Sequence, residues 1–397
     1  MIVLLLFILL LIPDLYVWHH FLRHAHWLWQ VLYWSVFAAT LLFMTLIRTP
    51  LYEAWMFRCG MTLLLCFSVP KMLFTLFSLV GLLAGRVVPA ASRCMDAIGG
   101  VVAVAVVGIV VYGLFFGWKK LAVNEYQLAF DDLPQGFDGY TIVHLSDMHI
   151  GTYLAAPEMV DSVVKQVNAI NSDMICFTGD LVNASPKELE QFMPVLKKLH
   201  ARDGIYSIMG NHDYCTYDHS AKDSPAMRVR RLQNLERELG WQMLNNDGVT
   251  IHHGGDSIAL AGVENSSKPP FPDYGDLKKA LTGVGDMFCI LLSHDPTHWQ
   301  REVLPKSAVQ LQLSGHTHST QFRMFGWSPA SFTYKEYGGL YEMLSNGTET
   351  FNPENPVSSS RKLFVSTGTG GNLPFRVGVP PEVVVLRLKA TKVMERN

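Results

Sequence analysis

The chain has 397 residues and a formal net charge of −2 at pH 7, and 49% of its residues are hydrophobic. Residues 1–118 hold six basic and three acidic side chains, a net of +3, whereas the remainder holds 26 basic and 31 acidic, a net of −5. This distribution excludes the strongly basic face of a nucleic-acid-binding protein. The clearest boundary lies near Lys119 and Lys120, so we expect two regions, residues 1–120 and 121–397.

The first region is apolar enough to cross a membrane several times. Residues 97–117 carry no charge and residues 61–84 carry only Lys71, and both reach the roughly 20 residues that a span requires. Residues 27–47 form a third run, with tryptophans near its start as in interfacial belts. Met1 to Trp18 lacks the basic start and cleavage site of a secretory signal. The sequence predicts a bundle of four transmembrane helices, near residues 1–22, 27–47, 61–84 and 97–117.

Two charged residues lie within the predicted spans. A charge in a bilayer is unfavourable unless it is paired or hydrated, so Asp14 and Lys71 either pair with each other or extend to an interface. Four histidines, at positions 19, 20, 24 and 26, lie between Trp18 and Trp27. Spacing alone rarely makes a ligand set, so we interpret this segment as an interfacial loop.

Two features indicate the membrane side. With four spans both chain ends face one side of the membrane, which holds one more Lys or Arg than the other side. The positive-inside rule then places the polar second region in the cytoplasm. Cys176 and Cys289 lie in predicted core strands, which indicates free thiols and a reducing compartment. Cys215 is expected to be a packing residue. We expect an integral membrane protein whose polar second region lies in the cytoplasm.

The second region alternates predicted strands with predicted helices, which is typical of an α/β sandwich. Helices are expected at 157–170, 186–199 and 227–239, and Pro194 is expected to bend or break the second. Residues 241–263 change to short alternating runs, which indicate a second sheet. The loops of this sheet are expected to border the functional site described next. Further along the chain, the sequence predicts helices at 277–281 and 299–303, a substrate-facing loop at 334–356, and strands at 362–366 and 383–388.

Five short polar segments each follow an apolar run that predicts a buried strand. The runs are 141–145, 174–178, 205–209, 288–292 and 309–313, and the segments after them contain Asp147 and His149; Asp180; Asn211, His212 and Asp213; His294; and His316 and His318. Open α/β sheets place their chemistry at the carboxyl ends of their strands. We therefore expect all five segments at one edge of a sheet.

These segments offer carboxylate, amide and imidazole donors. A mixed oxygen and nitrogen set suits Mn²⁺, Fe²⁺ or Zn²⁺ and lacks the thiolates of a structural zinc site. Seven candidate ligands are too many for one ion and suit two, and ions about 3.5–4 Å apart are the standard arrangement for in-line attack on phosphorus. A single histidine or Gly-Asp pair is commonly structural, but an ordered set of five is not expected by chance.

The ordered motifs D-x-H, G-D, G-N-H-D, H and G-H-x-H resemble the signature of the calcineurin-like metallophosphoesterase superfamily, over roughly residues 138–390. The resemblance implies a four-layer α/β/β/α metallophosphoesterase sandwich and two divalent ions, with Mn²⁺ favoured. It implies that the first ion is held by Asp147, His149, Asp180 and His318, and the second by Asp180, Asn211, His294 and His316. It also implies that His212 protonates the leaving oxygen, with Asp213 holding the other ring nitrogen.

The segment from Ser366 to Gly370, followed by Pro374-Phe375-Arg376, is similar to the membrane-associated YkuE/YaeI/LpxG-like branch of the superfamily. Ser319 to Phe322 departs from the Gly-Gln-Ile type stretch common in that branch. Arg376 is a candidate phosphate contact because a guanidinium fork matches phosphate oxygens, and a surface ion pair is the alternative. Further candidate substrate contacts are Asn183 and Asn245.

The resemblance implies a membrane-anchored phosphoric ester or anhydride hydrolase. Its substrate would be a phosphodiester or pyrophosphate in a lipid-linked molecule, such as UDP-2,3-diacylglucosamine of the lipid A pathway. One alternative is a broad phosphomonoesterase or protein phosphatase with the helices as an anchor only. The other is a membrane scaffold or sensor with a degenerate phosphoesterase fold, which is disfavoured because no ligand is missing.

Overall fold

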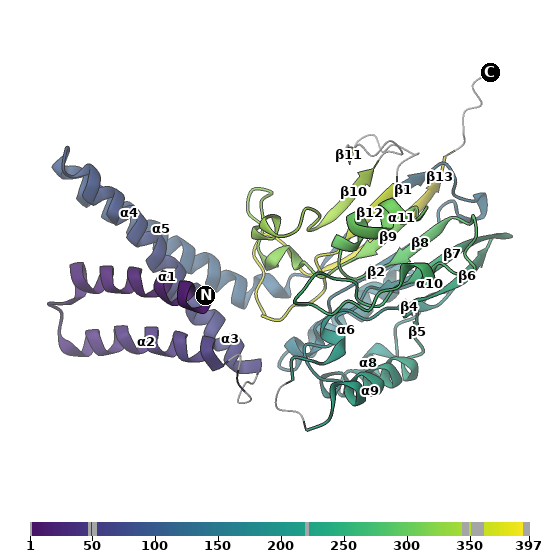
Figure 1. Cartoon of the computed structure of the whole chain (residues 1–397), viewed down its shortest axis with the longest axis horizontal. Coiled ribbons are helices and arrows are strands. Elements are labelled where there is room, and N and C mark those ends of the chain that lie inside the picture. Colours follow the sequence, from purple (N-terminus) through teal and green to yellow (C-terminus); the bar gives the residue numbers. More distant parts are fainter. Residues whose placement is uncertain are drawn as a thin grey trace, which may run out of the picture. The chain divides into compact units, whose positions relative to one another are not determined.

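A computed structural model describes residues 2–46, 49, 54–218, 222–343, 349–350 and 361–391. Its contacts divide the chain into two compact units, Met1–Phe115 with Asp218–Lys222, and Phe116–Tyr217 with Asp223–Asn397. The first unit is helical and the second is built on β-sheets (Figure 1). Residues 116–120 group with the second unit, and the domain boundary after residue 120 stays a prediction.

The helical unit has five described α-helices: α1 Ile2–Val17, α2 Trp27–Leu46, α3 Ala54–Leu63, α4 Val69–Ala84 and α5 Pro89–Phe115. A π-helical turn, Leu64–Ser68, joins α3 to α4. Among the described residues, three stretches are long and apolar enough to cross a membrane, Trp27–Leu46, Trp55–Ala84 and Pro89–Lys119, and Phe7–Leu22 is a shorter apolar helix. The predicted helical bundle is confirmed, with three long helices and one shorter one. The outer limits of two predicted spans, residues 1 and 47, lie outside the described residues.

The two charges within the predicted spans form an ion pair. Lys71 Nζ on α4 donates to the Asp14 carboxylate on α1, which confirms the pairing hypothesis. Asp14 is only 1% exposed, and Lys71 Nζ also lies 4.9 Å from the ring centre of Tyr33. The four histidines lie in the π-helical turn Trp18–Leu22 and in the turn that follows it, between α1 and α2.

Replacing either member of this pair with leucine should lower the thermal stability of the full-length protein in detergent, because the other charge is then left buried alone. Removing one partner of a buried pair is destabilising by about 3–5 kcal/mol. The double variant Asp14→Leu/Lys71→Leu should lose less than the sum of the single losses. Thermal unfolding of the four proteins measures this coupling, and additive losses would contradict it.

The second unit contains two β-sheets. The first sheet has the order β1-β13-β2-β3-β4-β5, and the second has the order β11-β10-β12-β9-β8-β7-β6. The strands of the first sheet are β1 Ala122–Phe130, β2 Thr141–Leu145, β3 Met174–Phe177, β4 Ile205–Ser207, β5 Gln242–Met243 and β13 Glu382–Ala390. Those of the second are β6 Asp247–His253, β7 Asp256–Gly262, β8 Cys289–Leu292, β9 Leu311–Ser314, β10 Gly339–Met343, β11 Glu349–Thr350 and β12 Arg361–Val365.

Three buried cores show that the unit has four layers. Val143 and Leu145 of β2 pack with helix residues on the outer face of the first sheet, whereas Ile142 packs between the two sheets. The helices on that outer face are α6 Glu158–Ile170, α7 Lys187–Glu190, α8 Met193–Leu196 and α9 Pro225–Glu238. The second sheet is covered by α10 Leu277–Ala280, a π-helical turn Trp299–Val303 and α11 Leu304–Lys306. The predicted α/β/β/α sandwich is confirmed (Figure 1).

Some local expectations hold and others are corrected. The helix expected at 186–199 is broken into α7 and α8, with Pro194 in the first turn of α8. The expectation that five strands end at one edge of one sheet is wrong, because β2, β3 and β4 belong to the first sheet and β8 and β9 to the second. The segment 334–356 contains strand β10, and its residues 344–348 and 351–356 lie outside the described part of the chain. Cys176, Cys215 and Cys289 are buried, as expected.

Glu236 of α9 makes the stability of the protein pH-dependent. It is 1% exposed, and its Oε2 accepts a hydrogen bond from Ser207 Oγ at 2.7 Å. Burial, followed by the charge of Asp213, raises the pKa of Glu236 from 4.5 to about 8. Between these values the folded protein keeps the proton that the unfolded chain releases, so the free energy of unfolding falls as pH rises. Each pKa unit corresponds to about 1.4 kcal/mol.

Glu236→Gln cannot ionise and still accepts from Ser207, so it should melt at a higher temperature than the wild type. The difference should grow from pH 5 to pH 8 and reach roughly 5 °C or more. Thermal unfolding of the full-length protein across this range tests it, with the exposed neighbour Glu238→Gln as control. An equal shift at every pH would contradict the assignment.

Candidate metal centre

The carboxyl ends of strands from both sheets converge on one buried centre. The predicted ligands form two groups that share Asp180, and the ligand atoms within each group lie within 4.8 Å of one another. The first group is Asp147, His149, Asp180 and His318, and the second is Asp180, His294 and His316. Asn211 adjoins the second group, because its Oδ1 lies 2.8 Å from Nδ1 of His316. The structure thus brings together all seven predicted ligands.

The backbone at the centre is held in an uncommon conformation. Asp147, His149, Asp180, His316 and His318 all have positive φ, between 43° and 70°. Such a conformation is unfavourable by about 1–3 kcal/mol for a non-glycine residue and is concentrated at functional sites. Gly315 shows how close the chains approach, since a Cβ there would lie 2.1 Å from Asp147 Oδ2. These turns aim side chains from separate strands at one point.

The donor atoms fit two divalent cations. The facing Nε2 atoms of His149 and His318 are 3.1 Å apart. They lie 3.5 Å from Asp180 Oδ2 and 3.3 Å from Asp147 Oδ1, respectively. His294 Nδ1 lies 2.7 Å from the carbonyl oxygen of Thr178, which turns its Nε2 to within 3.2 Å of Asp180 Oδ2. Such an oxygen and nitrogen set is the one that divalent transition ions prefer.

Burial determines which of these groups are charged. It lowers the pKa of His149 to about 3 and that of His316 to about 4, and it holds the pKa of His318 well below its usual range. For His294 burial is again the largest single influence and acts in the same direction. The charges of Asp180 and Asp147, with the hydrogen bonds to Asp180 and to the Thr178 carbonyl, together outweigh it and raise the pKa to about 10. Neutral imidazoles offer a lone pair to a metal ion, and a cation at Asp180 would compete with the proton on His294.

His212 lies beside the first group without belonging to it. Its ring meets the ring of His149 edge to face, with centroids 4.7 Å apart, and lies 4.4 Å from the ring of Tyr217. Its Nδ1 lies 2.5 Å from the backbone oxygen of Asn183, and its Nε2 lies 3.3 Å from Nδ2 of Asn372. A carbonyl oxygen can only accept, so Nδ1 carries a hydrogen and Nε2 is the nitrogen available for proton exchange.

The expected contact between Asp213 and the ring of His212 is wrong. The Asp213 carboxylate accepts hydrogen bonds from the backbone N–H groups of Asp180, Leu181, Val182 and Gly210, at 2.7–3.2 Å. Asn183 takes the place predicted for Asp213, through its backbone oxygen. Asp213 therefore positions the segment that carries Asp180.

The expectation that Arg376 binds phosphate or forms a surface ion pair is also wrong. Arg376 is 1% exposed. Its guanidinium donates to the carbonyl oxygens of Thr367, Gly368 and Gly370 and reaches that of Val379 at 3.5 Å. The side chain thus holds together the C-terminal loop that packs on the centre, where a Cβ on Gly368 would lie 2.6 Å from Asp147 Cβ.

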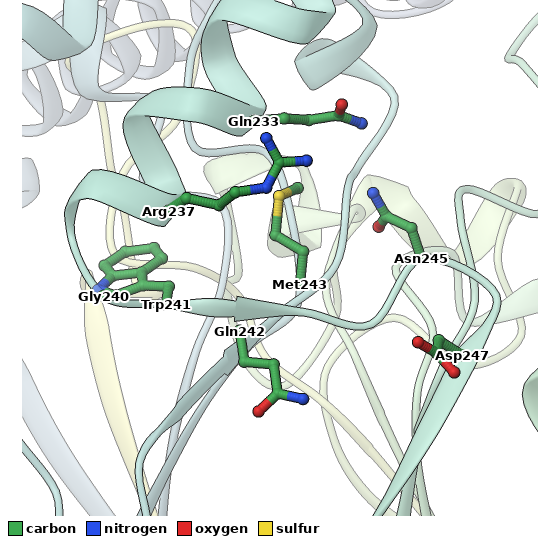
Figure 2. A pocket seen from close by; sticks show the side chains of 8 residues that line it. All are labelled: Gln233, Arg237, Gly240, Trp241, Gln242, Met243, Asn245 and Asp247. Carbon is green, nitrogen blue, oxygen red and sulfur yellow. The ribbon is translucent and has the colours of Figure 1, made fainter.

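The two candidate asparagines lie in different places. Asn183 is 9% exposed, and its side-chain amide donates to Thr152 Oγ1 and to Asn372 Oδ1, next to His212. Asn245 instead lines an open cavity of about 560 Å³ between α9 and β5, with Gln233, Arg237, Gly240, Trp241, Gln242, Met243 and Asp247 (Figure 2). No candidate metal ligand lines that cavity. The structure therefore brings Asn183 next to His212, whereas Asn245 lines a cavity that holds none of the candidate metal ligands.

Four residues at the centre were not singled out from the sequence. Tyr217 and Asn372 contact His212, as described above, while Tyr334 and Asp295 adjoin His316. The Tyr334 hydroxyl lies 2.9 Å from His316 Nε2, and an Asp295 carboxylate oxygen lies 3.9 Å from the same atom. A sequence signal existed for Tyr334, which begins the segment predicted to face the substrate, and for Asp295, which follows His294 directly.

The fold and the centre define a two-sheet α/β sandwich with a candidate dinuclear metal site. The sequence model of the family described as calcineurin-like phosphoesterase matches residues 140–320, the range that supplies every candidate ligand. The chain therefore carries a calcineurin-like metallophosphoesterase domain, of a family that hydrolyses phosphoester bonds. The resemblance drawn from the motifs is confirmed.

Three relatives illustrate the likeness. The chain is 28% identical over 415 residues to the transmembrane protein with metallophosphoesterase domain of Bos taurus, covering 96% of this chain and 87% of that protein. It is 28% identical to the uncharacterized metallophosphoesterase YkuE of Bacillus subtilis, covering 70% of this chain and 90% of that protein. It is 27% identical to the UDP-2,3-diacylglucosamine pyrophosphatase LpxG of Chlamydia trachomatis, covering 64% of this chain and 86% of that protein. Together with the three long apolar helices, these likenesses support a transmembrane metallophosphoesterase.

Proposed function

We propose that the chain is a membrane-anchored phosphoesterase that hydrolyses a phosphodiester or pyrophosphate bond in a lipid-linked substrate. The observation that carries this proposal is the pair of donor groups sharing Asp180, in a chain with three helices long enough to cross a membrane. A substrate already held in the bilayer need only present its phosphate to the centre. The name of the Chlamydia relative makes UDP-2,3-diacylglucosamine the most concrete candidate substrate.

The proposed ligands divide as the two groups do. One divalent ion would be held by Asp147, His149, Asp180 and His318, and the other by Asp180, Asn211, His294 and His316. We propose Mn²⁺, with Fe²⁺ or Zn²⁺ as alternatives that the same donors suit. When bound, two such ions supply Lewis acidity and neutralise charge at the phosphoryl group.

The protein itself positions the charges and the proton. The backbone N–H of His212 donates to Asp180 Oδ1 at 2.8 Å, which fixes the shared carboxylate. The Asn183 carbonyl accepts from His212 Nδ1, so the second ring proton, which the imidazolium form carries on Nε2, is the one given to the leaving oxygen, and the ring is left neutral. A general acid must lie within hydrogen-bond reach of the leaving oxygen. The position of His212 beside the first donor group meets this requirement.

The test is an assay of the full-length protein, purified in detergent and loaded with Mn²⁺. The substrates are UDP-2,3-diacylglucosamine, other lipid diesters and pyrophosphates, soluble bis-p-nitrophenyl phosphate and phosphomonoesters. We expect turnover of diester or pyrophosphate bonds, fastest for the lipid. If bis-p-nitrophenyl phosphate is hydrolysed and the lipids are not, the lipid substrate is wrong and the reaction class stands.

The two alternatives make different predictions. A broad phosphomonoesterase or protein phosphatase would keep full activity without the helical unit. A cut at or after Trp118 would remove part of the domain itself, because β1 begins at Ala122 and both Trp118 and Leu121 pack against the core. A cut before Phe116 falls at the boundary between the two compact units and leaves the second unit whole at this end. A scaffold or sensor would show no phosphoesterase activity toward any substrate of the panel.

For location, we propose the bacterial inner membrane with the catalytic domain in the cytoplasm. Two observations support the cytoplasmic side. The side of the membrane that holds both chain ends carries one more Lys or Arg than the other side, and the thiols of Cys176 and Cys289 are free and buried. Protease treatment of sealed spheroplasts tests the side. A cytoplasmic domain resists the protease until the membrane is opened, and cleavage in intact spheroplasts would place it outside.

A further inference from the structure

Residues 324–333, here called the aromatic loop, expose three aromatic side chains. Phe325 is 100% exposed, Phe332 is 83% exposed and Trp327 is 46% exposed. Phe325 and Phe332 are the two most exposed large hydrophobic side chains among the described residues of the second unit. Residues 324–334 contain no charged side chain. The loop therefore presents an uncharged aromatic surface, which is rare where a protein surface faces only water.

The backbone of this loop is well held, so the exposure is a feature of the fold. Met324 and Trp327 exchange backbone hydrogen bonds of 2.9 and 3.0 Å. Ser328 Oγ donates to the Ser319 carbonyl at 2.6 Å and accepts from the Ala330 N–H at 3.2 Å. These bonds tie the loop to the segment that directly follows His318.

The residue at the tip of the loop is not explained by its local conformation. Phe325 and Gly326 have φ of 51° and 78°, in the two-residue turn closed by Met324 and Trp327. Turns with two positive φ values favour Asn, Asp and Gly, and a bulky side chain there is a genuine outlier. Nothing within the described chain covers the ring, since it is fully exposed. Neither turn chemistry nor burial accounts for a phenylalanine at this position.

A lipid surface is the partner that suits this loop. The last candidate span ends at Lys119, and β1 begins at Ala122, so the chain enters the second unit a few residues from a membrane helix. Aromatic side chains concentrate at the membrane–water interface, and an uncharged loop loses little hydration there. The foot of the loop also reaches the centre, through the hydrogen bond between Tyr334 and His316.

We propose that the aromatic loop docks on the lipid bilayer, with Phe325 and Phe332 inserted at the interface, and so holds the metal centre next to lipid phosphates. The part of this inference that concerns the substrate rests on the proposed function. The contact with lipid does not, because it needs no catalysis.

The contact is tested by photo-crosslinking. p-Benzoylphenylalanine is placed at position 325 of the full-length protein, which is reconstituted into vesicles of phosphatidylethanolamine and phosphatidylglycerol, irradiated and analysed by mass spectrometry. The matched control has the same group at Met227, which is 61% exposed on α9. We expect lipid adducts at position 325 in clear excess over position 227, also in an Asp180→Asn background. No excess, or adducts to a second copy or to another protein, would overturn the proposal.

A second experiment separates this inference from the proposed function. Phe325→Asn suits the turn and should leave thermal stability unchanged or higher, and Phe332→Ser removes the other exposed ring. The double variant should hydrolyse bis-p-nitrophenyl phosphate like the wild type and vesicle-bound UDP-2,3-diacylglucosamine roughly tenfold less efficiently, as for a loss of about 1.4 kcal/mol in binding. Equal loss on both substrates would contradict docking. If the wild type leaves the lipid intact, the substrate proposal fails and the crosslinking result still decides the contact.

Discussion

Asp180→Asn should abolish nearly all phosphoesterase activity, lowering kcat by roughly a thousandfold or more. Asp180 is the one carboxylate common to both donor groups, and asparagine keeps its shape without its charge. Metal ions contribute several kcal/mol of charge stabilisation in such reactions, and each 1.4 kcal/mol or so is tenfold in rate. Steady-state kinetics and elemental analysis of the purified full-length protein measure the effect, and bound metal should fall below two ions per chain.

The control for this substitution is Asp161→Asn, which changes a carboxylate on α6 in the same unit, away from both donor groups. It should keep activity and metal content. An Asp180→Asn protein with unchanged phosphoesterase activity would remove the two-metal mechanism.

His212→Gln should lower kcat by about 10²–10⁴, the range that general acid catalysis contributes, while leaving metal content unchanged. The reason is that His212 lies beside the two donor groups without belonging to either. The loss should be larger for a leaving alkoxide than for nitrophenolate, because a weakly basic leaving group needs little protonation. Rates for bis-p-nitrophenyl phosphate and for an alkyl phosphodiester, measured side by side, show the difference.

His200→Gln is the matched control, because His200 is exposed on the same unit. It should change neither rate. Equal losses on both substrates for His212→Gln, or a loss of metal, would assign His212 a structural role instead.

The centre was predictable because each of its ligands belongs to a local pattern, an apolar run followed by a short polar segment. Asp147 and Asp180 could be found in this way without knowing which strands pair. The strands that pair with β8 and β9 could not be predicted, because strand pairing depends on contacts between residues far apart in the sequence. β9 lies beside β12 in the second sheet, although β12 begins about fifty residues later. An alternating pattern indicates a strand and leaves its neighbours open.

The errors concerned side chains whose direction depends on the surrounding backbone. Asp213 lies within a short 3₁₀ turn, His212–Tyr214, which points its carboxylate at the N–H groups of the β3 loop instead of at the adjacent ring. Arg376 looked exposed because arginine is rarely buried without a partner. Its partners are the carbonyl oxygens of one loop, and no sequence pattern marks a carbonyl as a partner.

The division of the ligands between two sheets links ion binding to folding. Asp147 and Asp180 extend from the first sheet, whereas His294, His316 and His318 extend from the second. An ion held by both joins the halves of the sandwich, and its affinity adds to the free energy of unfolding. Starving a cell of the right divalent cation would then loosen the sandwich itself, leaving less intact protein as well as less hydrolysis.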